Sequence, residues 1–220
     1  MNLEKMFKMQ TELDRRIIKE KGLEGQDLLP NTYAALITEL GEFANEGRWF
    51  KHWSDDQQPK TERLIDCSAC NGTGDMNYQR IAEDAEGSGG HEYIKCEECH
   101  GEGTEGIKNP LLEEYADCLH FFLSIAIKKG WHLYLLEESI EDFQREGFEG
   151  GLSGAFLKMQ WHLLNSQMFS DEYTKESNFR LAWWLFIAIG IVGFGFTLDQ
   201  IEAAYMDKNA VNHQRQQEGY

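Results

Sequence analysis

The chain has 220 residues, 41% of them hydrophobic, a length that suits one domain or one domain with a small inserted module. Its formal net charge of −17 argues against the basic face that duplex-DNA binders use, so we expect no duplex nucleic acid as a partner. The first ten residues show no basic segment followed by an apolar stretch, so no signal peptide is predicted.

Two helices are predicted in the first part of the chain. From about Leu3 to Lys21 the apolar residues recur near helical spacing, which indicates an amphipathic helix that ends before Gly22. A second helix is expected from an N-cap at Asn31 through the run YAALITELGEFANEGRWFKHW. Pro59 and the polar run before it end this segment.

Residues 64–107 differ from the rest of the chain in composition. They hold four of the five cysteines and many glycines, and they show neither helical nor strand periodicity over any length. We therefore predict a loop-rich inserted module at 64–107, within a domain formed by 1–63 and 108–220.

The chain returns to helical patterns after the module. Asn109 and Pro110 have the character of an N-cap and a first helical residue, and Gly130 follows two lysines as a helix end. Further helical patterns cover about 133–146, 154–168, 177–192 and 198–210, the last opened by a capping box of Thr197 and Gln200. Without any βαβ alternation, the predicted fold class is all-α, a helical bundle.

The most apolar segment is Leu181–Phe196. A membrane span needs about 20 residues of helix. This run is shorter, and three glycines interrupt it. We expect a buried core helix and no membrane association.

Two acidic pairs are candidates for a metal site. Glu39 and Glu42, like Glu114 and Asp117, are three residues apart, so each pair shares one helix face. Four carboxylates around one pocket would repel each other, and a hard cation such as Mg²⁺ removes that repulsion. The alternative is solvated surface charge, since the chain has 38 acidic residues.

The blocks that carry these pairs are ITELGEFANEGRWFKHWS and LLEEYADCLHFF, and the chain ends in AYMDKNAVNHQRQQEGY. Together they resemble the all-α nucleoside triphosphate pyrophosphatases, and within them the dimeric dUTPases of some phages and bacteria. The sequence departs from that pattern where 71 residues, most of them in the predicted module, separate Glu42 from Glu114.

The resemblance implies Mg²⁺-dependent hydrolysis of dUTP to dUMP and pyrophosphate by a homodimer. It implies a cytoplasmic enzyme, in a bacterium or in the host of a phage. Glu39, Glu42, Glu114 and Asp117 would be the catalytic, Mg²⁺-binding carboxylates, with Glu42 a candidate for orienting the attacking water. Hydrolysis of dCTP or another nucleotide remains an alternative, because carboxylates read metal and phosphate rather than base.

By the same resemblance, the C-terminal helix supplies the phosphate contacts. Lys208, Asn212 and Arg215 are spaced four and three residues apart and so share a helix face. Tyr220, the last residue, would close over the nucleotide.

The base contacts implied are Gln10, Trp53, His120 and Phe121, which offer an amide, an imidazole and aromatic walls. Asp14 is a further candidate for a nucleoside contact. For His120 and Phe121 the alternative is an ordinary place in the core.

The module contains two CxxC motifs, Cys67/Cys70 and Cys96/Cys99, separated by 25 residues. This spacing predicts a structural tetrahedral Zn²⁺ site. Each motif extends to CxxCxGxG, which resembles the zinc-binding repeats of DnaJ-type chaperones over these residues only. Two disulfides or a redox pair are the alternatives.

Two functions are open for the zinc module itself. The zinc would stabilise the fold of an insertion that lacks its own hydrophobic core, or the module would bind a protein partner. The contrasting hypothesis for the whole chain is an interaction protein without catalysis, which leaves the carboxylate pairs and the tail without a role.

Overall fold

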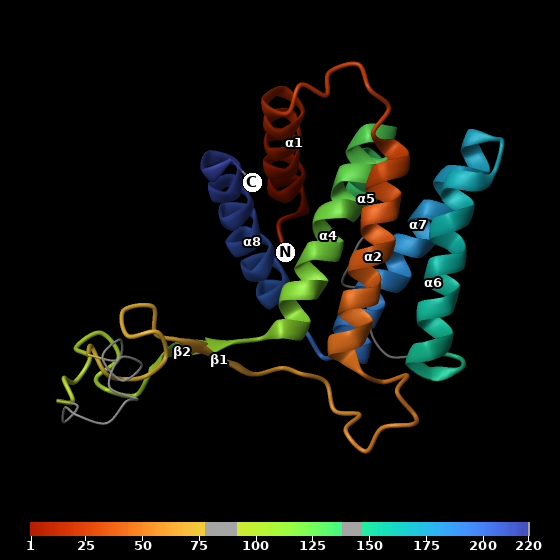
Figure 1. Ribbon diagram of the computed structural model, residues 1–220. Helices are drawn as coiled ribbons and strands as arrows, with labels where there is room; N and C mark the ends of the chain where they lie inside the picture. Colours follow the sequence, from red (N-terminus) through yellow and green to blue (C-terminus); the bar gives the residue numbers. More distant parts are fainter. Residues whose placement is uncertain (78–91, 138–146, 220) are drawn as a thin grey trace. The chain divides into compact units, whose positions relative to one another are not determined.

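The computed structural model describes residues 1–77, 92–137 and 147–219, which pack as two compact units. One unit consists of Met1–Pro59 and Leu111–Tyr220, and the other of Lys60–Pro110. The helices belong to the first unit and the strands to the second (Figure 1).

The helical unit confirms the predicted all-α class. Its elements are α1 (Leu3–Glu20), α2 (Leu29–Gly47), α4 (Pro110–Lys129), α5 (His132–Glu137), α6 (Gly151–Met168), α7 (Glu172–Ala188), the π-helix η3 (Ile189–Gly193) and α8 (Leu198–Glu218).

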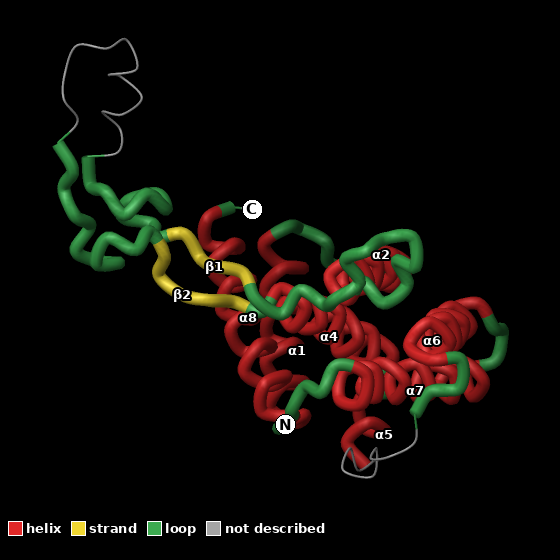
Figure 2. The backbone as a smooth tube through the Cα atoms, turned by 90° about the horizontal axis from the view of Figure 1, so that it is seen from below, coloured by secondary structure: helices red, strands yellow, loops and turns green. Residues whose placement is uncertain are grey.

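Helix α4 is the centre of this unit (Figures 1 and 2). Its Tyr115 ring meets Phe43 of α2 edge-on, and its Phe122 ring stacks on Phe186 of α7 at 4.6 Å. Its His120 ring stacks on Tyr205 of α8 at 4.2 Å. Because α4 is packed on several sides, acidic residues on it are held beside apolar neighbours rather than in open water.

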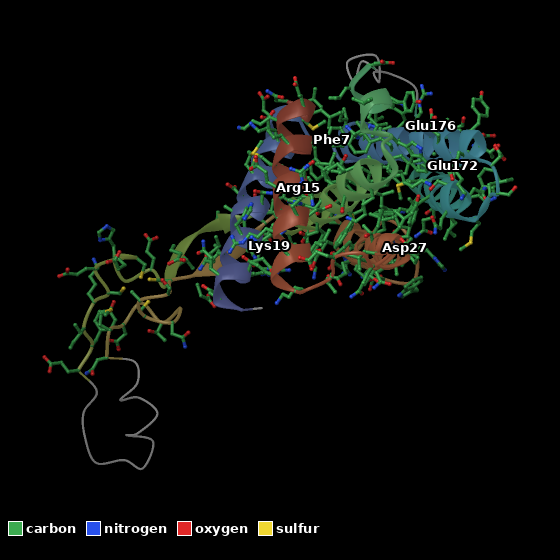
Figure 3. All side chains as sticks on the ribbon, turned by 90° about the horizontal axis from the view of Figure 1, so that it is seen from above. Phe7, Arg15, Lys19, Asp27, Glu172 and Glu176 are labelled. Atoms are coloured by element: carbon green, nitrogen blue, oxygen red, sulfur yellow. The ribbon has the colours of Figure 1, made fainter. Side chains whose placement is uncertain are left out.

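Helix α1 is amphipathic as predicted. Met6 and Leu13 are buried on its inner face. Arg15 and Lys19, one turn apart on α1, are exposed (Figure 3). The inner face therefore orients Gln10, which lies between the two buried apolar residues, toward the interior.

The predicted bounds of α2 are wrong at both ends. The helix begins at Leu29, so Asn31 is not its N-cap. It ends at Gly47, because Arg48 adopts a left-handed conformation with φ of 58°. The Trp49 ring then folds back over Gly47, at a point where a Cβ would lie 2.4 Å from the ring. The aromatic run therefore packs against the helix end instead of continuing it.

The other predicted ends agree more closely. Thr197 and Gln200 form the expected capping box, and Gly130 follows α4 with φ of 71°. Helix α8 continues to Glu218, well past the predicted end near 210. Of the pattern at 133–146, α5 covers the start, and 138–146 lie outside the described residues.

The apolar segment Leu181–Phe196 forms the end of α7, the π-helix and the turn after it. Ala182, Trp183, Phe186 and Ile187 are fully buried, which confirms a core helix. Among the described residues no single helix has the length and composition of a membrane span. One pair, Glu172–Gly193 with Leu198–Glu218, passes that test only when taken together, across a bend of 114°.

The smaller unit contains a two-stranded antiparallel sheet of β1 (Arg63–Asp66) and β2 (Thr104–Lys108). Leu64 pairs with Ile107, and the register shifts between Ile65 and Asp66. These strands are only four and five residues long, which is why the composition of the module predicts loops and misses them.

Candidate active site and cysteine centre

The acidic pairs meet where α2 and α4 lie beside each other. Carboxylate oxygens of Glu39, Glu42 and Glu114 lie within 4.8 Å of one another, close enough to share one ion. Asp117, one turn after Glu114, instead receives Lys208 Nζ of α8 at 2.5 Å from its Oδ2. The structure thus joins three of the four predicted ligands and connects the fourth to the predicted phosphate-binding helix.

Partial burial makes the charged state of Glu39, Glu114 and Asp117 unfavourable. Burial and the nearby charges of Asp117, Glu42 and Glu39 raise the pKa of Glu114 to about 7. Burial also raises the pKa of Glu39, with added repulsion from Asp117 and Glu42. For Asp117, burial raises the pKa and the Lys208 ion pair opposes it. Oxygen-only ligands with mutual repulsion are the donor set that a hard divalent cation fits.

A cavity of about 230 Å³ opens beside this cluster. Glu39 and Asp117 line it, so the cavity shares two residues with the predicted metal site. The other predicted residues on its wall are Gln10, His120, Phe121, Lys208, Asn212 and Arg215. Packing of α1, α4 and α8 therefore gathers an amide, an imidazole, an aromatic ring and two cations next to the acidic cluster.

Among the described residues predicted to bind the base or the phosphates, Trp53 does not line this cavity. Trp53 lies on the loop after α2, is 67% exposed, and has edge contacts with the rings of Phe50 and His52. Tyr220 lies outside the described residues.

Ser124 and Gln216, which the residue patterns did not single out, also line this cavity. Ser124 and Lys128 line an adjoining cavity of about 310 Å³. Ser124 and Lys128 continue the helical steps from Asp117 and His120 along one face of α4. Following that face would have found them. Asp14, the weaker candidate, lines both cavities.

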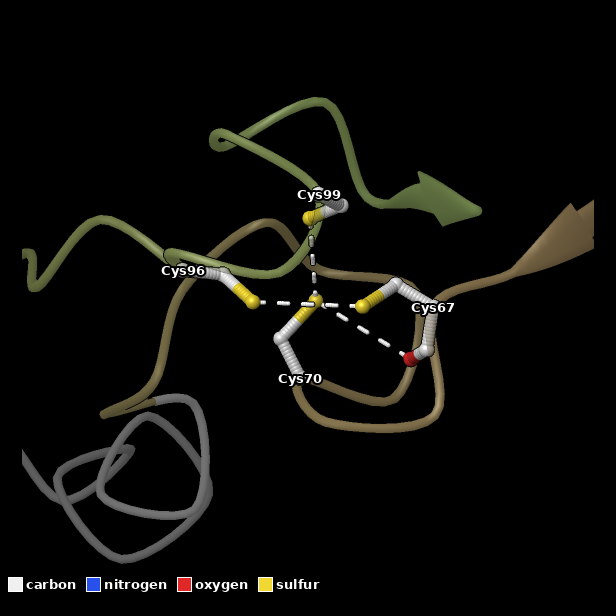
Figure 4. A group of neighbouring side chains, drawn as sticks. All are labelled: Cys67, Cys70, Cys96 and Cys99. Carbon is white, nitrogen blue, oxygen red and sulfur yellow. Dashed lines mark hydrogen bonds between the residues drawn. The ribbon is translucent and has the colours of Figure 1, made fainter. Parts of the chain in front are cut away.

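The smaller unit brings the four predicted cysteines together (Figure 4). All four are buried, and their sulfurs lie within 4.8 Å of one another. The Cys67–Cys96 and Cys70–Cys99 sulfurs are 3.8 and 3.7 Å apart. A tetrahedral zinc with bonds of about 2.3 Å requires sulfurs about 3.8 Å apart, whereas a disulfide requires about 2.05 Å.

In both CxxCxGxG repeats, the last glycine donates a backbone hydrogen bond to the second cysteine sulfur. Gly74 N donates to Cys70 Sγ at 3.1 Å, and Gly103 N donates to Cys99 Sγ at 3.2 Å. Burial alone would raise the pKa of Cys99, but the Gly103 N–H and the neighbouring thiols lower it to about 7. The thiolate of Cys99, the form that binds metal, is thus stabilised. At Cys67 burial prevails and raises the pKa to about 11.

A Cβ on either of these glycines would also collide with backbone. At Gly74 it would lie 2.3 Å from the Gly101 carbonyl oxygen, and at Gly103 it would lie 2.4 Å from the Gly72 carbonyl oxygen. All four glycines have positive φ, between 74° and 81°. The repeated motif therefore builds two equivalent turns packed against each other.

A comparison with curated proteins finds no match. A family model described as dUTPase matches residues 2–67 and 102–220. The matched residues include the acidic pairs and the C-terminal helix, and the unmatched stretch between them holds three of the four clustered cysteines. With its all-helical main unit and this match over most of its length, the chain belongs to the dUTPase family, of the all-α type that hydrolyses dUTP.

Proposed function

We propose that this enzyme hydrolyses dUTP to dUMP and pyrophosphate with Mg²⁺ held by Glu39, Glu42, Glu114 and Asp117. The observation that carries the proposal is the acidic cluster beside a cavity that also holds cationic side chains. Bound Mg²⁺ supplies charge neutralisation at the phosphates and a more acidic water.

The side chains of α8 suit the triphosphate. Lys208 and Arg215 bring positive charge to the cavity and Asn212 adds an amide donor. Tyr220 is proposed to close over the nucleotide from the C-terminal end. A polyanion of this kind needs such local cations, because the chain as a whole carries a net charge of −17.

The nucleoside is assigned to the part of the cavity formed by α1 and α4. Gln10 and His120 offer polar groups there, and Phe121 offers a ring for stacking. Trp53 remains a candidate from its exposed loop. The alternative substrate is dCTP, because the acidic cluster and the cations bind phosphate and metal in either nucleotide.

The test is pyrophosphate release from each dNTP and NTP, with Mg²⁺ or with EDTA. We expect release from dUTP that EDTA abolishes. Equal kcat/KM for dUTP and dCTP would overturn uracil specificity, and no release from any nucleotide would overturn the proposed reaction. Quantifying dUMP against pyrophosphate distinguishes this cleavage from stepwise loss of phosphate.

We propose further that residues 64–107 form an inserted module held by one structural zinc ion on Cys67, Cys70, Cys96 and Cys99. The sulfur separations support zinc over disulfides. We propose that the module is also a surface on which a protein partner docks. Elemental analysis of the tag-free protein should find one zinc per chain.

We also propose a homodimer that pairs through α6. Leu157, Trp161, Leu164 and Met168 follow the 4-3-4 spacing of a helix seam, and each is between 42% and 75% exposed. Lys158 is the only charged residue in Gly151–Met168, although the chain is strongly acidic. Two copies with a large negative charge can approach each other best along a face without acids.

The neighbouring helix α2 complements that seam. Tyr33 OH of α2 and Ser166 Oγ of α6 are 2.8 Å apart, so the two helices lie side by side (Figure 2). Between them is a mostly apolar groove of about 480 Å³, whose walls include Gly41, Phe50 and Leu157. Large side chains on α6 beside a groove on α2 are what a two-fold, self-complementary interface requires.

Sedimentation equilibrium tests this dimer. We expect the wild type at twice the 25.4 kDa chain mass, Leu157→Glu as a monomer, and the matched variant Leu133→Glu as a dimer. Leu157 and Leu133 are 65% and 60% exposed, so the two substitutions carry similar folding risk. A monomeric wild type would refute the dimer, and a dimeric Leu157→Glu would refute this face.

A further inference from the structure

A buried hydrogen-bond chain forms one wall of the nucleotide cavity. At its centre is Gln10, which is 4% exposed and bound at both ends of its amide. One end lies 2.7 Å from His120 Nδ1 and 3.1 Å from the Tyr205 hydroxyl. The other end lies 2.8 Å from Asp14 Oδ1. The proposed reaction uses neither Asp14 nor Tyr205.

Asp14 decides which way the Gln10 amide points. An ionised carboxylate only accepts hydrogen bonds. Lys128 Nζ forms an ion pair with Asp14 Oδ2 at 2.8 Å, and Ser124 Oγ donates to the same oxygen at 2.5 Å. The amide nitrogen of Gln10 must therefore face Asp14, and its oxygen must face His120 and Tyr205.

The Gln10 oxygen in turn decides the state of His120. An amide oxygen only accepts, so His120 Nδ1 must carry a proton. Burial lowers the pKa of His120 to about 4, against a smaller opposing effect of the Tyr205 backbone carbonyl, so near pH 7 the ring holds a single proton. That proton is on Nδ1, which leaves a lone pair on Nε2.

This lone pair has no partner among the described residues. His120 Nε2 is buried and makes no hydrogen bond there, and the residue lines the cavity. Stacking of the ring on Tyr205, with centroids 4.2 Å apart and planes 20° apart, holds it in place. A buried acceptor left unpaired is unfavourable, so a ligand that donates to it gains binding.

We propose that Asp14, through Gln10, is a positioning residue that makes His120 Nε2 an obligate hydrogen-bond acceptor for a donor of the bound nucleoside. Lys128 supports this relay through its ion pair with Asp14, and Tyr205 supports it by stacking on the imidazole. The donor is the N3–H of the uracil base or the 3′-hydroxyl of the sugar. The ligand's identity rests on the proposed function, whereas the protonation pattern does not.

Nitrogen-15 NMR of histidine-labelled protein without nucleotide tests the protonation pattern. We expect the neutral Nδ1–H form of His120 from pH 6 to 8. In Asp14→Asn the new amide can accept or donate, so Gln10 is free to flip and the Nε2–H form should appear. Asp55→Asn, an exposed site on a loop, is the matched control and should leave the spectrum unchanged.

Two results would overturn the relay. One is a wild-type ring with its proton on Nε2, directed at the Tyr205 carbonyl. The other is an unchanged tautomer in a folded Asp14→Asn variant. If that variant does not fold, Lys128→Met replaces it, with the neighbouring Lys129→Met as control, because Lys129 pairs with Glu172 instead. The NMR spectra report the tautomer of His120 without any measurement of hydrolysis, so this test is independent of the proposed reaction.

Two substrate analogues identify the donor. 3-Methyl-dUTP lacks the N3–H, and 2′,3′-dideoxy-UTP lacks the 3′-hydroxyl. We expect one of them to lose about 100-fold or more in kcat/KM, since a site built around a donor rejects the analogue without it. Asp14→Asn should shrink that loss. If both analogues keep the kcat/KM of dUTP, the donor assignment is overturned, even if the tautomer of His120 is as proposed.

Discussion

Two sets of four candidate metal ligands in this chain look alike in sequence and differ in how they are built. The cysteine centre is assembled from two short motifs whose own glycines donate to the sulfurs. The acidic cluster depends on the packing of α2 against α4, and Asp117 is engaged by Lys208 from a third helix. A motif can organise a soft thiolate site locally, whereas a carboxylate site on helices needs the tertiary fold.

The largest expected effect separates the clusters by function. Glu42→Gln should lower kcat/KM for dUTP by about 100-fold or more, because it removes one of three clustered carboxylates from the metal. Glu12→Gln, on the exposed face of α1, is the control. Steady-state kinetics across Mg²⁺ concentrations measures both. Wild-type kinetics in Glu42→Gln would remove Glu42 from the site.

A second prediction separates the clusters by stability. Cys99→Ser should lose the proposed zinc and unfold the described part of the smaller unit, because metal binding to such sites supplies about 10 kcal/mol or more of folding free energy. The main thermal transition of the helical unit should move little, because that unit has a core of its own. Zinc analysis and hydrogen exchange would show both. Equal loss of protection in both units would contradict the separation.

A third prediction uses pH, to which the acidic cluster should respond. The pKa of Glu114 is raised to about 7 in the folded chain, so folding takes up protons between its ordinary value near 4.5 and 7. Stability of the protein in EDTA should therefore fall as pH rises through that window. The change should be about 1 kcal/mol, since the group is partly solvated.

Chemical denaturation at pH 5.5 and 8, with EDTA or Mg²⁺, measures this effect. Mg²⁺ should remove most of the difference, because the cation neutralises the cluster. Glu114→Gln should flatten the dependence in EDTA. Stability in EDTA that rises over this range would contradict the assignment.

The smallest expected effect concerns the polar wall of the nucleotide cavity. Lys128→Met should lower kcat/KM for dUTP about 10-fold, with most of the change in KM, because it weakens the support of Asp14. Lys129→Met should change it little. Equal effects of the two substitutions would show that Lys128 acts only on overall charge.

The bounds of the elements show how far local patterns reach. The capping box at Thr197 and the glycine after α4 were predictable, because caps depend on residues within one turn. The end of α2 was not, because its aromatic run continues helical spacing past Gly47. Only the presence of Phe43 and Phe194 around the Trp49 ring explains why the chain turns there.

The sequence by itself determined the all-α class, the two acidic pairs and the zinc-type motifs, because helical spacing and CxxC spacing are local properties. The family match agrees with the first of these. Tertiary structure decided that Lys208 engages Asp117 and that Asp14, Gln10 and His120 form one chain of hydrogen bonds. The Lys208–Asp117 and Gln10–His120 contacts join residues 91 and 110 positions apart, whereas Gln10 and Asp14 lie one turn apart on α1. No local pattern encodes which distant partners a folded core brings together.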